Sequence, residues 1–171
     1  MSSGCCSCGS NDCCDPAPAK KKMTIEFLYL DLTVCERCQG TESNLDKAVE
    51  EVSKVLEAAG YDLKINKVNI ISEELAVKHK FISSPTIRVN GRDIALSVKE
   101  TECKECGDLC GDDVECRVWE YEGQEYTEPP TAMIINAIMK EVYGGSETNP
   151  PANDGYVLPD NLKTFFRGIK K

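Results

Sequence analysis

A pair of cysteines, Cys35 and Cys38, has the spacing of a reactive dithiol, C-x-x-C. The thiolate is the nucleophile, and a free cysteine with a pKa near 8.5 is mostly protonated at neutral pH. A position near the start of a helix favours the Cys35 anion, and Arg37 between the two cysteines adds positive charge. Cys38, one helical turn on, can attack a mixed disulfide and release the substrate. The pair therefore predicts thiol–disulfide exchange.

A second group of cysteines follows the spacing C-x2-C-x3-C-x5-C, and its members are Cys103, Cys106, Cys110 and Cys116. Four sulfur ligands can close a tetrahedral zinc site, so zinc is the expected cofactor. An iron–sulfur cluster uses the same ligands and stays an alternative. A redox pair that takes electrons from Cys35 and Cys38 is another, and a site that only stabilises the insert is a third.

Five further cysteines lie near the N-terminus, at Cys5, Cys6, Cys8, Cys13 and Cys14. They are too crowded for one mononuclear site but suit thiophilic ions, which they could pass on to the dithiol. The alternative is a disordered, easily oxidised tail without a defined role.

The composition is that of an ordinary globular protein, with 171 residues, 41% hydrophobic and 29% charged. The sequence contains neither a bilayer-spanning apolar run nor an apolar signal region, so we expect a cytoplasmic protein. In a reducing cytosol, clustered cysteines are more often metal ligands or redox-active thiols than structural disulfides. The net charge of −9 argues against nucleic acid and anionic membranes as partners.

Three segments are predicted. Residues 1–22 form a disordered cysteine-rich tail, 23–143 form one α/β domain with a cysteine-rich insert at 101–116, and 144–171 form a linker and a short amphipathic helix. Within the domain, hydrophobic periodicity and turn residues predict strands at 24–33, 61–71, 86–89 and 93–98, and helices at 41–60, 72–80 and 131–143. The last helix covers 162–169, with Asp160 as its cap.

This order of elements resembles the thioredoxin superfamily over residues 23–98 and 131–143. Two features carry the resemblance: the dithiol after the first strand and Ser84-Pro85 before a short strand. The resemblance implies a three-layer thioredoxin-like sandwich without a nucleotide cofactor. It also implies that Cys35 attacks and Cys38 resolves, that Pro85 is cis and faces them, and that Ser84 and Pro85, with Arg37 nearby, contact the substrate.

The motif differs from the Cys-Gly-Pro-Cys of typical thioredoxins, and no tryptophan precedes it. More specifically, the C-x-R-C pair, the Ser-Pro-Thr-Ile stretch and the insert resemble a small uncharacterised prokaryotic family of thioredoxin-like proteins, over most of residues 23–170. That resemblance implies a fold and no substrate.

The leading expectation is therefore thiol–disulfide exchange with a disulfide-containing protein or a small oxidised thiol. The alternative is a protein that binds or delivers soft ions (zinc, cadmium, mercury, copper(I) or arsenic(III)) and is not an enzyme. A third interpretation is a scaffold in which the C-x-x-C pair is structural.

Overall fold

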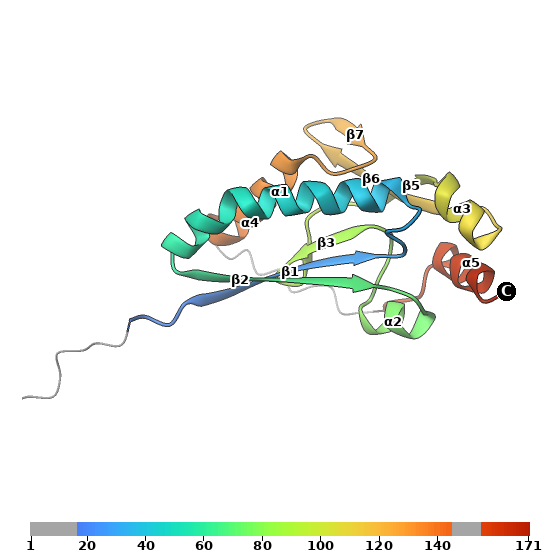
Figure 1. Ribbon diagram of the computed structural model, residues 1–171, viewed down its shortest axis with the longest axis horizontal. Helices are drawn as coiled ribbons and strands as arrows, with labels where there is room; N and C mark the ends of the chain where they lie inside the picture. Colours follow the sequence, from blue (N-terminus) through green and yellow to red (C-terminus); the bar gives the residue numbers. More distant parts are fainter. Residues whose placement is uncertain (1–16, 145–154) are drawn as a thin grey trace, which may run out of the picture.

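The structure is a computed structural model that describes residues 17–144 and 155–171, and it is a mixed α/β protein (Figure 1). The five cysteines of the predicted tail lie outside the described residues, as does most of the predicted linker.

A four-stranded sheet forms the centre of the domain, with the strand order β2-β1-β3-β4. Its strands are β1 (Lys21–Tyr29), β2 (Tyr61–Asn69), β3 (Thr86–Val89) and β4 (Arg92–Asp93). Strand β1 pairs parallel with β2 and antiparallel with β3, and β3 pairs antiparallel with β4. The centre of β1 is apolar, and Met23, Ile25, Phe27 and Leu28 are buried in it. Burial of this kind is expected of a strand that has neighbours on both sides.

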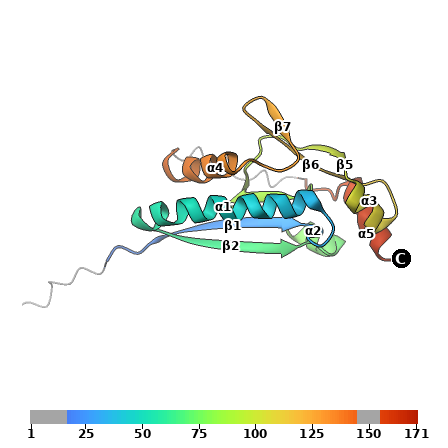
Figure 2. The same ribbon diagram turned by 45° about the horizontal axis from the view of Figure 1, so that its top comes forward.

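Helix α1 (Glu36–Ala58) lies along one face of the sheet, and α4 (Thr131–Tyr143) packs beside it (Figures 1 and 2). The buried side of α1 repeats with helical spacing, at Leu45, Ala48, Val52 and Leu56. These side chains share one core with Ile134 and Ile138 of α4. The short helix α2 (Glu73–Lys78) follows β2, and the Ser72 hydroxyl caps it by accepting from the Leu75 amide.

The insert and the hairpin after it form a second sheet of three strands, in the order β5-β6-β7. Strand β5 (Lys99–Glu102) leads into α3 (Lys104–Cys110), and the chain returns as β6 (Glu115–Tyr121) and β7 (Gln124–Tyr126). Strands β6 and β7 are joined at Glu122 and Gly123, both with positive φ. Strands β6 and β7 therefore form a hairpin.

The C-terminal helix α5 (Asp160–Ile169) packs against α3 at one end of the molecule (Figure 1). Its apolar side chains Leu162, Phe165 and Phe166 are buried in a second core, which also contains all six cysteines of the described residues. Helix α5 thus covers the region in which the cysteines gather.

Several boundaries differ from the sequence-based expectations. Helix α5 begins at Asp160, and Pro159 instead of Asp160 is its N-cap residue. Helix α1 begins at Glu36 instead of 41, because Cys35 caps it, and Gly40 inside it leaves room for the Glu128 side chain. The strand expected at 93–98 ends at Asp93, whose carboxylate accepts from the Ala95 amide and turns the chain away from the sheet. Strand β1 begins at Lys21, inside the segment assigned to the tail.

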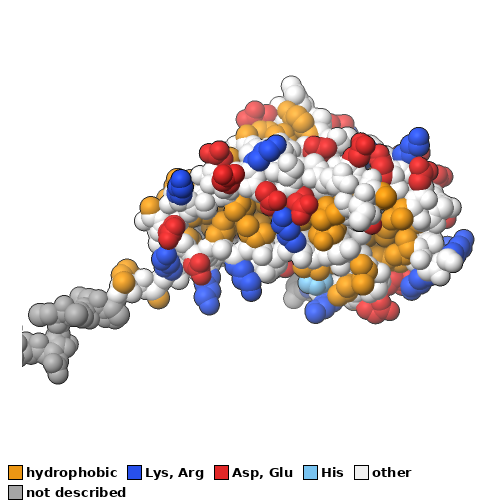
Figure 3. All heavy atoms as spheres, in the orientation of Figure 1, with side chains coloured by type: hydrophobic (Ala, Val, Ile, Leu, Met, Phe, Trp, Pro, Cys, Tyr) orange, Lys and Arg blue, Asp and Glu red, His pale blue; other side chains and the backbone are white. Residues whose placement is uncertain are grey.

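Among the described residues, no helix is both long and apolar enough to cross a lipid bilayer. Acidic and basic side chains are interspersed over the face drawn in Figure 3. Lys67 of β2 forms ion pairs with Glu42 and Asp46 of α1.

A close backbone approach fixes α5 on α3. A Cβ on Gly168 would lie 2.6 Å from Cys110 Cβ and closer still to the Cys110 carbonyl. We expect Gly168→Ala to lower the free energy of unfolding by about 1–3 kcal/mol, as overpacking does elsewhere. Urea denaturation measures this change. Arg167→Ala, on the exposed side of the same helix, is the control and should stay within about 0.5 kcal/mol of the parent; equal effects would contradict the tight packing.

Candidate metal centre

Four cysteine sulfurs converge where the insert meets the end of the main sheet. They belong to Cys35, Cys103, Cys106 and Cys116, and all lie within 4.8 Å of one another. None of the four residues is more than 1% exposed. This group, called the four-sulfur site below, is close enough to hold one metal ion.

Local structure positions each sulfur. Cys35 ends the loop after β1 and caps α1, and its sulfur accepts a hydrogen bond from the Cys38 amide at 3.4 Å. Cys103 occupies the N-cap position of α3 without a side-chain capping hydrogen bond, and Cys106 follows one turn later. Cys116 lies on β6 opposite Thr101 of β5. The insert thus supplies three sulfurs and the core domain one.

Arg37 fastens the insert to the core. Its Nη1 donates to Thr101 Oγ1 at 2.9 Å and to the Cys116 carbonyl at 3.0 Å, and its Nη2 donates to the Glu102 carbonyl at 2.8 Å. A planar guanidinium can span two neighbouring strands in this manner, which an ammonium cannot. Arg37, predicted as a substrate contact, thus binds the backbone beside Cys103 and Cys116.

A second attachment joins β6 to the loop before β3. The Arg117 amide donates to the Ser84 carbonyl at 2.7 Å, and the buried Arg117 side chain donates to Thr86 Oγ1 at 3.0 Å and to Asp93 at 2.8 Å. The guanidinium also lies over the Trp119 ring. The strand that carries Cys116 is therefore attached both to Arg37 of α1 and to the loop before β3.

The four thiols influence one another's ionisation. Hydrogen bonds from the Cys103, Cys106 and Cys116 thiols lower the pKa of Cys35. The pKa values of Cys106 and Cys116 are raised, chiefly through their interaction with Cys103. Hydrogen bonds from Cys106 and Cys116 also lower the pKa of Cys103, so without a cation the thiolates of Cys35 and Cys103 are stabilised at the expense of the other two. A bound cation would let all four sulfurs ionise, since it compensates their repulsion.

Cys38 lies next to the four-sulfur site but is not part of it. Its sulfur is 3.4 Å from Ser84 Oγ, and the thiol is fully buried. Its interaction with Cys35, together with burial, raises the pKa of Cys38. The Ser84-Pro85 bond is cis, and Ser84 Oγ also accepts from the Leu30 amide at 3.1 Å. Of the two residues predicted to face the dithiol, Ser84 contacts the Cys38 sulfur.

Cys110, the remaining cysteine of the insert, also lies outside the group. Its thiol is directed to the carbonyls of Gly107 and Asp112, at 3.7 and 3.6 Å. The structure places Cys35 with Cys103, Cys106 and Cys116, where the sequence grouped those three with Cys110. The spacing along the insert does not indicate that Cys35 takes the place of Cys110, because tertiary packing brings Cys35 to the site.

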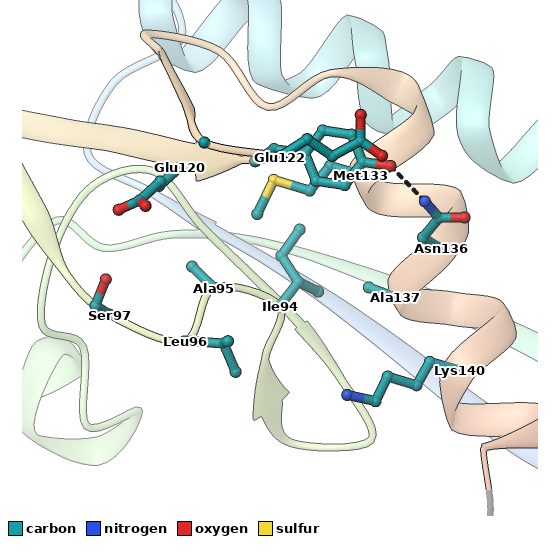
Figure 4. A pocket seen from close by; sticks show the side chains of 12 residues that line it. Ile94, Ala95, Leu96, Ser97, Glu120, Glu122, Met133, Asn136, Ala137 and Lys140 are labelled. Carbon is teal, nitrogen blue, oxygen red and sulfur yellow. Dashed lines mark hydrogen bonds between the residues drawn. The ribbon is translucent and has the colours of Figure 1, made fainter.

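A cavity of about 350 Å³ adjoins Cys103. Its lining includes the acidic residues Glu102, Asp108, Asp112 and Asp113. A larger cavity of about 510 Å³ lies between α4, the β6–β7 turn and the segment after β4 (Figure 4). Met133 and Ile94 point into it, and no cysteine lines it. In the smaller cavity, the carboxylates beside Cys103 favour the approach of cations to the four-sulfur site.

The fold and the site together define a mixed α/β protein with a buried group of four cysteines. The chain belongs to the family described as Domain of unknown function (DUF2703), whose model matches residues 23–138. An uncharacterized protein of Archaeoglobus fulgidus is 32% identical over 107 residues, which make up 60% of this chain and 75% of that relative. No solved structure was found to match the chain. The matched range contains every cysteine of the four-sulfur site.

Removal of the Arg37 guanidinium should loosen the insert. Because it donates to backbone and hydroxyl groups of β5 and β6, we expect Arg37→Ala to lower the free energy of unfolding by about 2 kcal/mol and Arg37→Lys by less. Limited proteolysis should cut the insert faster in Arg37→Ala. Lys104→Ala, an exposed substitution in the insert, is the control. Unchanged cleavage in Arg37→Ala would contradict this role.

Proposed function

We propose that this protein binds one soft metal ion, such as zinc or cadmium, through Cys35, Cys103, Cys106 and Cys116. The convergence of their four sulfurs within 4.8 Å is the observation that supports it. Thiolates are soft ligands and select soft ions over magnesium or calcium.

The spacing suits a mononuclear site. Sulfurs at the corners of a tetrahedron with zinc–sulfur bonds near 2.3 Å lie about 3.8 Å apart. The Cys106 and Cys116 sulfurs are 3.5 Å apart, so only small movements would complete the tetrahedron. An iron–sulfur cluster fits less well, because its cysteines bind two or four different irons and the sulfurs would have to spread.

Burial supports the same proposal. Four thiols in one buried group are poor candidates for solvent-exposed nucleophiles, whereas a closed set of four sulfurs is typical of tightly held zinc. Binding would join the insert to the core domain, so part of the binding free energy would stabilise the fold.

Metal titration tests the proposal in a full-length chain that carries Cys5→Ser, Cys6→Ser, Cys8→Ser, Cys13→Ser and Cys14→Ser, called the tail-substituted chain below. We expect one cadmium or zinc ion per reduced chain. Each single serine substitution at Cys35, Cys103, Cys106 or Cys116 should weaken metal binding at least about 100-fold. This loss is at least as large as the one that usually follows substitution of a residue that only hydrogen-bonds to a metal ligand. Competition with a chromophoric chelator measures the affinity.

Cys110→Ser is the matched control for these substitutions, because Cys110 is a buried insert cysteine outside the site. It should keep the parent stoichiometry and affinity within about threefold. Failure of the tail-substituted chain to bind one ion would refute the proposal, as would a loss in Cys110→Ser equal to that in Cys116→Ser.

Thiol–disulfide exchange through Cys35 and Cys38 is a second candidate function. The strand order β2-β1-β3-β4 and the proximity of Ser84 to Cys38 support a thioredoxin-like assignment. The Cys35 sulfur lies at the start of a 23-residue helix and accepts a hydrogen bond from the Cys38 amide. Both features favour the Cys35 thiolate. Exchange would require the insert to open, since both thiols are buried.

Trapping tests this second candidate. In metal-free protein, Cys38→Ser should accumulate a mixed disulfide on Cys35 when a small disulfide is added, because the resolving thiol is missing. Zinc should suppress the adduct by occupying the Cys35 sulfur. Intact-mass and peptide analysis measure the adduct, with Cys35→Ser as the control. Absence of any adduct in metal-free Cys38→Ser would exclude exchange.

A further inference from the structure

We infer that Cys38 controls release of the bound ion, by forming a disulfide with Cys35 and so removing one of the four sulfurs from the site. This inference rests on the proposed metal binding. It assigns a role to a buried thiol that metal coordination leaves unused, and it makes the four-sulfur site responsive to oxidants.

The position of Cys38 carries the inference. Its backbone amide donates to the Cys35 sulfur at 3.4 Å, and the two cysteines stand three residues apart at the start of helix α1. Cys35 therefore belongs to the four-sulfur site and also contacts the backbone of Cys38, whose thiol follows one helical turn later. A disulfide and a metal bond would compete for the same sulfur.

Packing alone accounts less well for a cysteine at this place. A small apolar side chain would fill the core equally, but the Cys38 sulfur lies 3.4 Å from Ser84 Oγ, a polar partner that orients the thiol. Cys110 provides the contrast within the same core. Its thiol donates to the carbonyls of Gly107 and Asp112, and its sulfur is not part of the four-sulfur site.

The chemistry balances with a hydroperoxide as oxidant. The metal-bound Cys35 thiolate, the Cys38 thiol, one hydrogen peroxide and one proton give the Cys35–Cys38 disulfide and two waters. The two sulfurs lose two electrons, which break the peroxide O–O bond. Because thiolates and not disulfides bind metal, the ion keeps only three sulfur ligands and leaves more readily.

The coupling is reciprocal, since oxidation and metal binding act on one sulfur. If the disulfide weakens zinc binding about 100-fold, saturating zinc must favour the reduced dithiol by the same factor. That factor corresponds to a rise of about 60 mV in the reduction potential of this two-electron couple.

Peroxide-driven zinc release tests the inference. The zinc-loaded tail-substituted chain is treated with hydrogen peroxide, and released zinc is followed with a chromophoric chelator while peptide mapping identifies the disulfide. We expect a Cys35–Cys38 disulfide to accompany release. Cys38→Ser should bind zinc as tightly as the parent when reduced, but release it at least about tenfold more slowly. Cys110→Ser, the matched control, should release it at the parent rate.

Each outcome of this experiment either supports or overturns the inference. Equal release from Cys38→Ser and the parent would overturn the inference, as would a first disulfide between insert cysteines such as Cys106 and Cys116. If Cys38→Ser folds poorly, mapping of the first disulfide in the parent still decides. Tight zinc binding without Cys38-dependent release would refute only this inference, whereas failure to bind zinc when reduced would refute the proposed function itself.

Discussion

The convergence of four buried sulfurs constrains the structure around it. Thiols this close, at Cys35, Cys103, Cys106 and Cys116, cannot all ionise in an apolar core without a compensating cation. The surrounding side chains exclude water, which strengthens both the repulsion among thiolates and their attraction to an ion. A cation at this point would turn an unfavourable group of charges into a link between two parts of the chain.

The elements around the site hold the insert over the core. Arg37 connects α1 to the backbone of β5 and β6, and the Arg117 amide connects β6 to Ser84. Helix α5 closes the same region from the other side, where Gly168 allows it to approach α3. These contacts are hydrogen bonds and packing that do not need an ion. The insert can therefore be preorganised before metal binds, which reduces the ordering cost of binding.

Much of the fold follows from the sequence pattern. The apolar stripe of α1, the Ser72 cap and the turn at Glu122 and Gly123 are local signals, and each predicts its element. The start of α1 is different. The glycine at 40 suggests a later start, but the helix begins at Glu36 because Cys35 caps it, and Gly40 makes room for the Glu128 side chain. Helix boundaries of this kind depend on tertiary contacts that propensity does not contain.

The membership of the site could be predicted only in part. Spacing singles out the insert cysteines, three of which lie in the four-sulfur site. It cannot show that Cys110 turns toward backbone carbonyls while Cys35 comes from the core domain. Arg37 illustrates the same limit. Its position between two cysteines suggests an electrostatic role toward the dithiol, and its hydrogen bonds to β5 and β6 become visible only in three dimensions.

A crystal structure of the zinc-loaded chain, with anomalous diffraction measured at the zinc edge, tests the central claim most directly. The account predicts one anomalous peak bonded to the sulfurs of Cys35, Cys103, Cys106 and Cys116, at about 2.3 Å from each. A zinc ion held by Cys110 in place of Cys35, or the absence of a peak among these sulfurs, would contradict it.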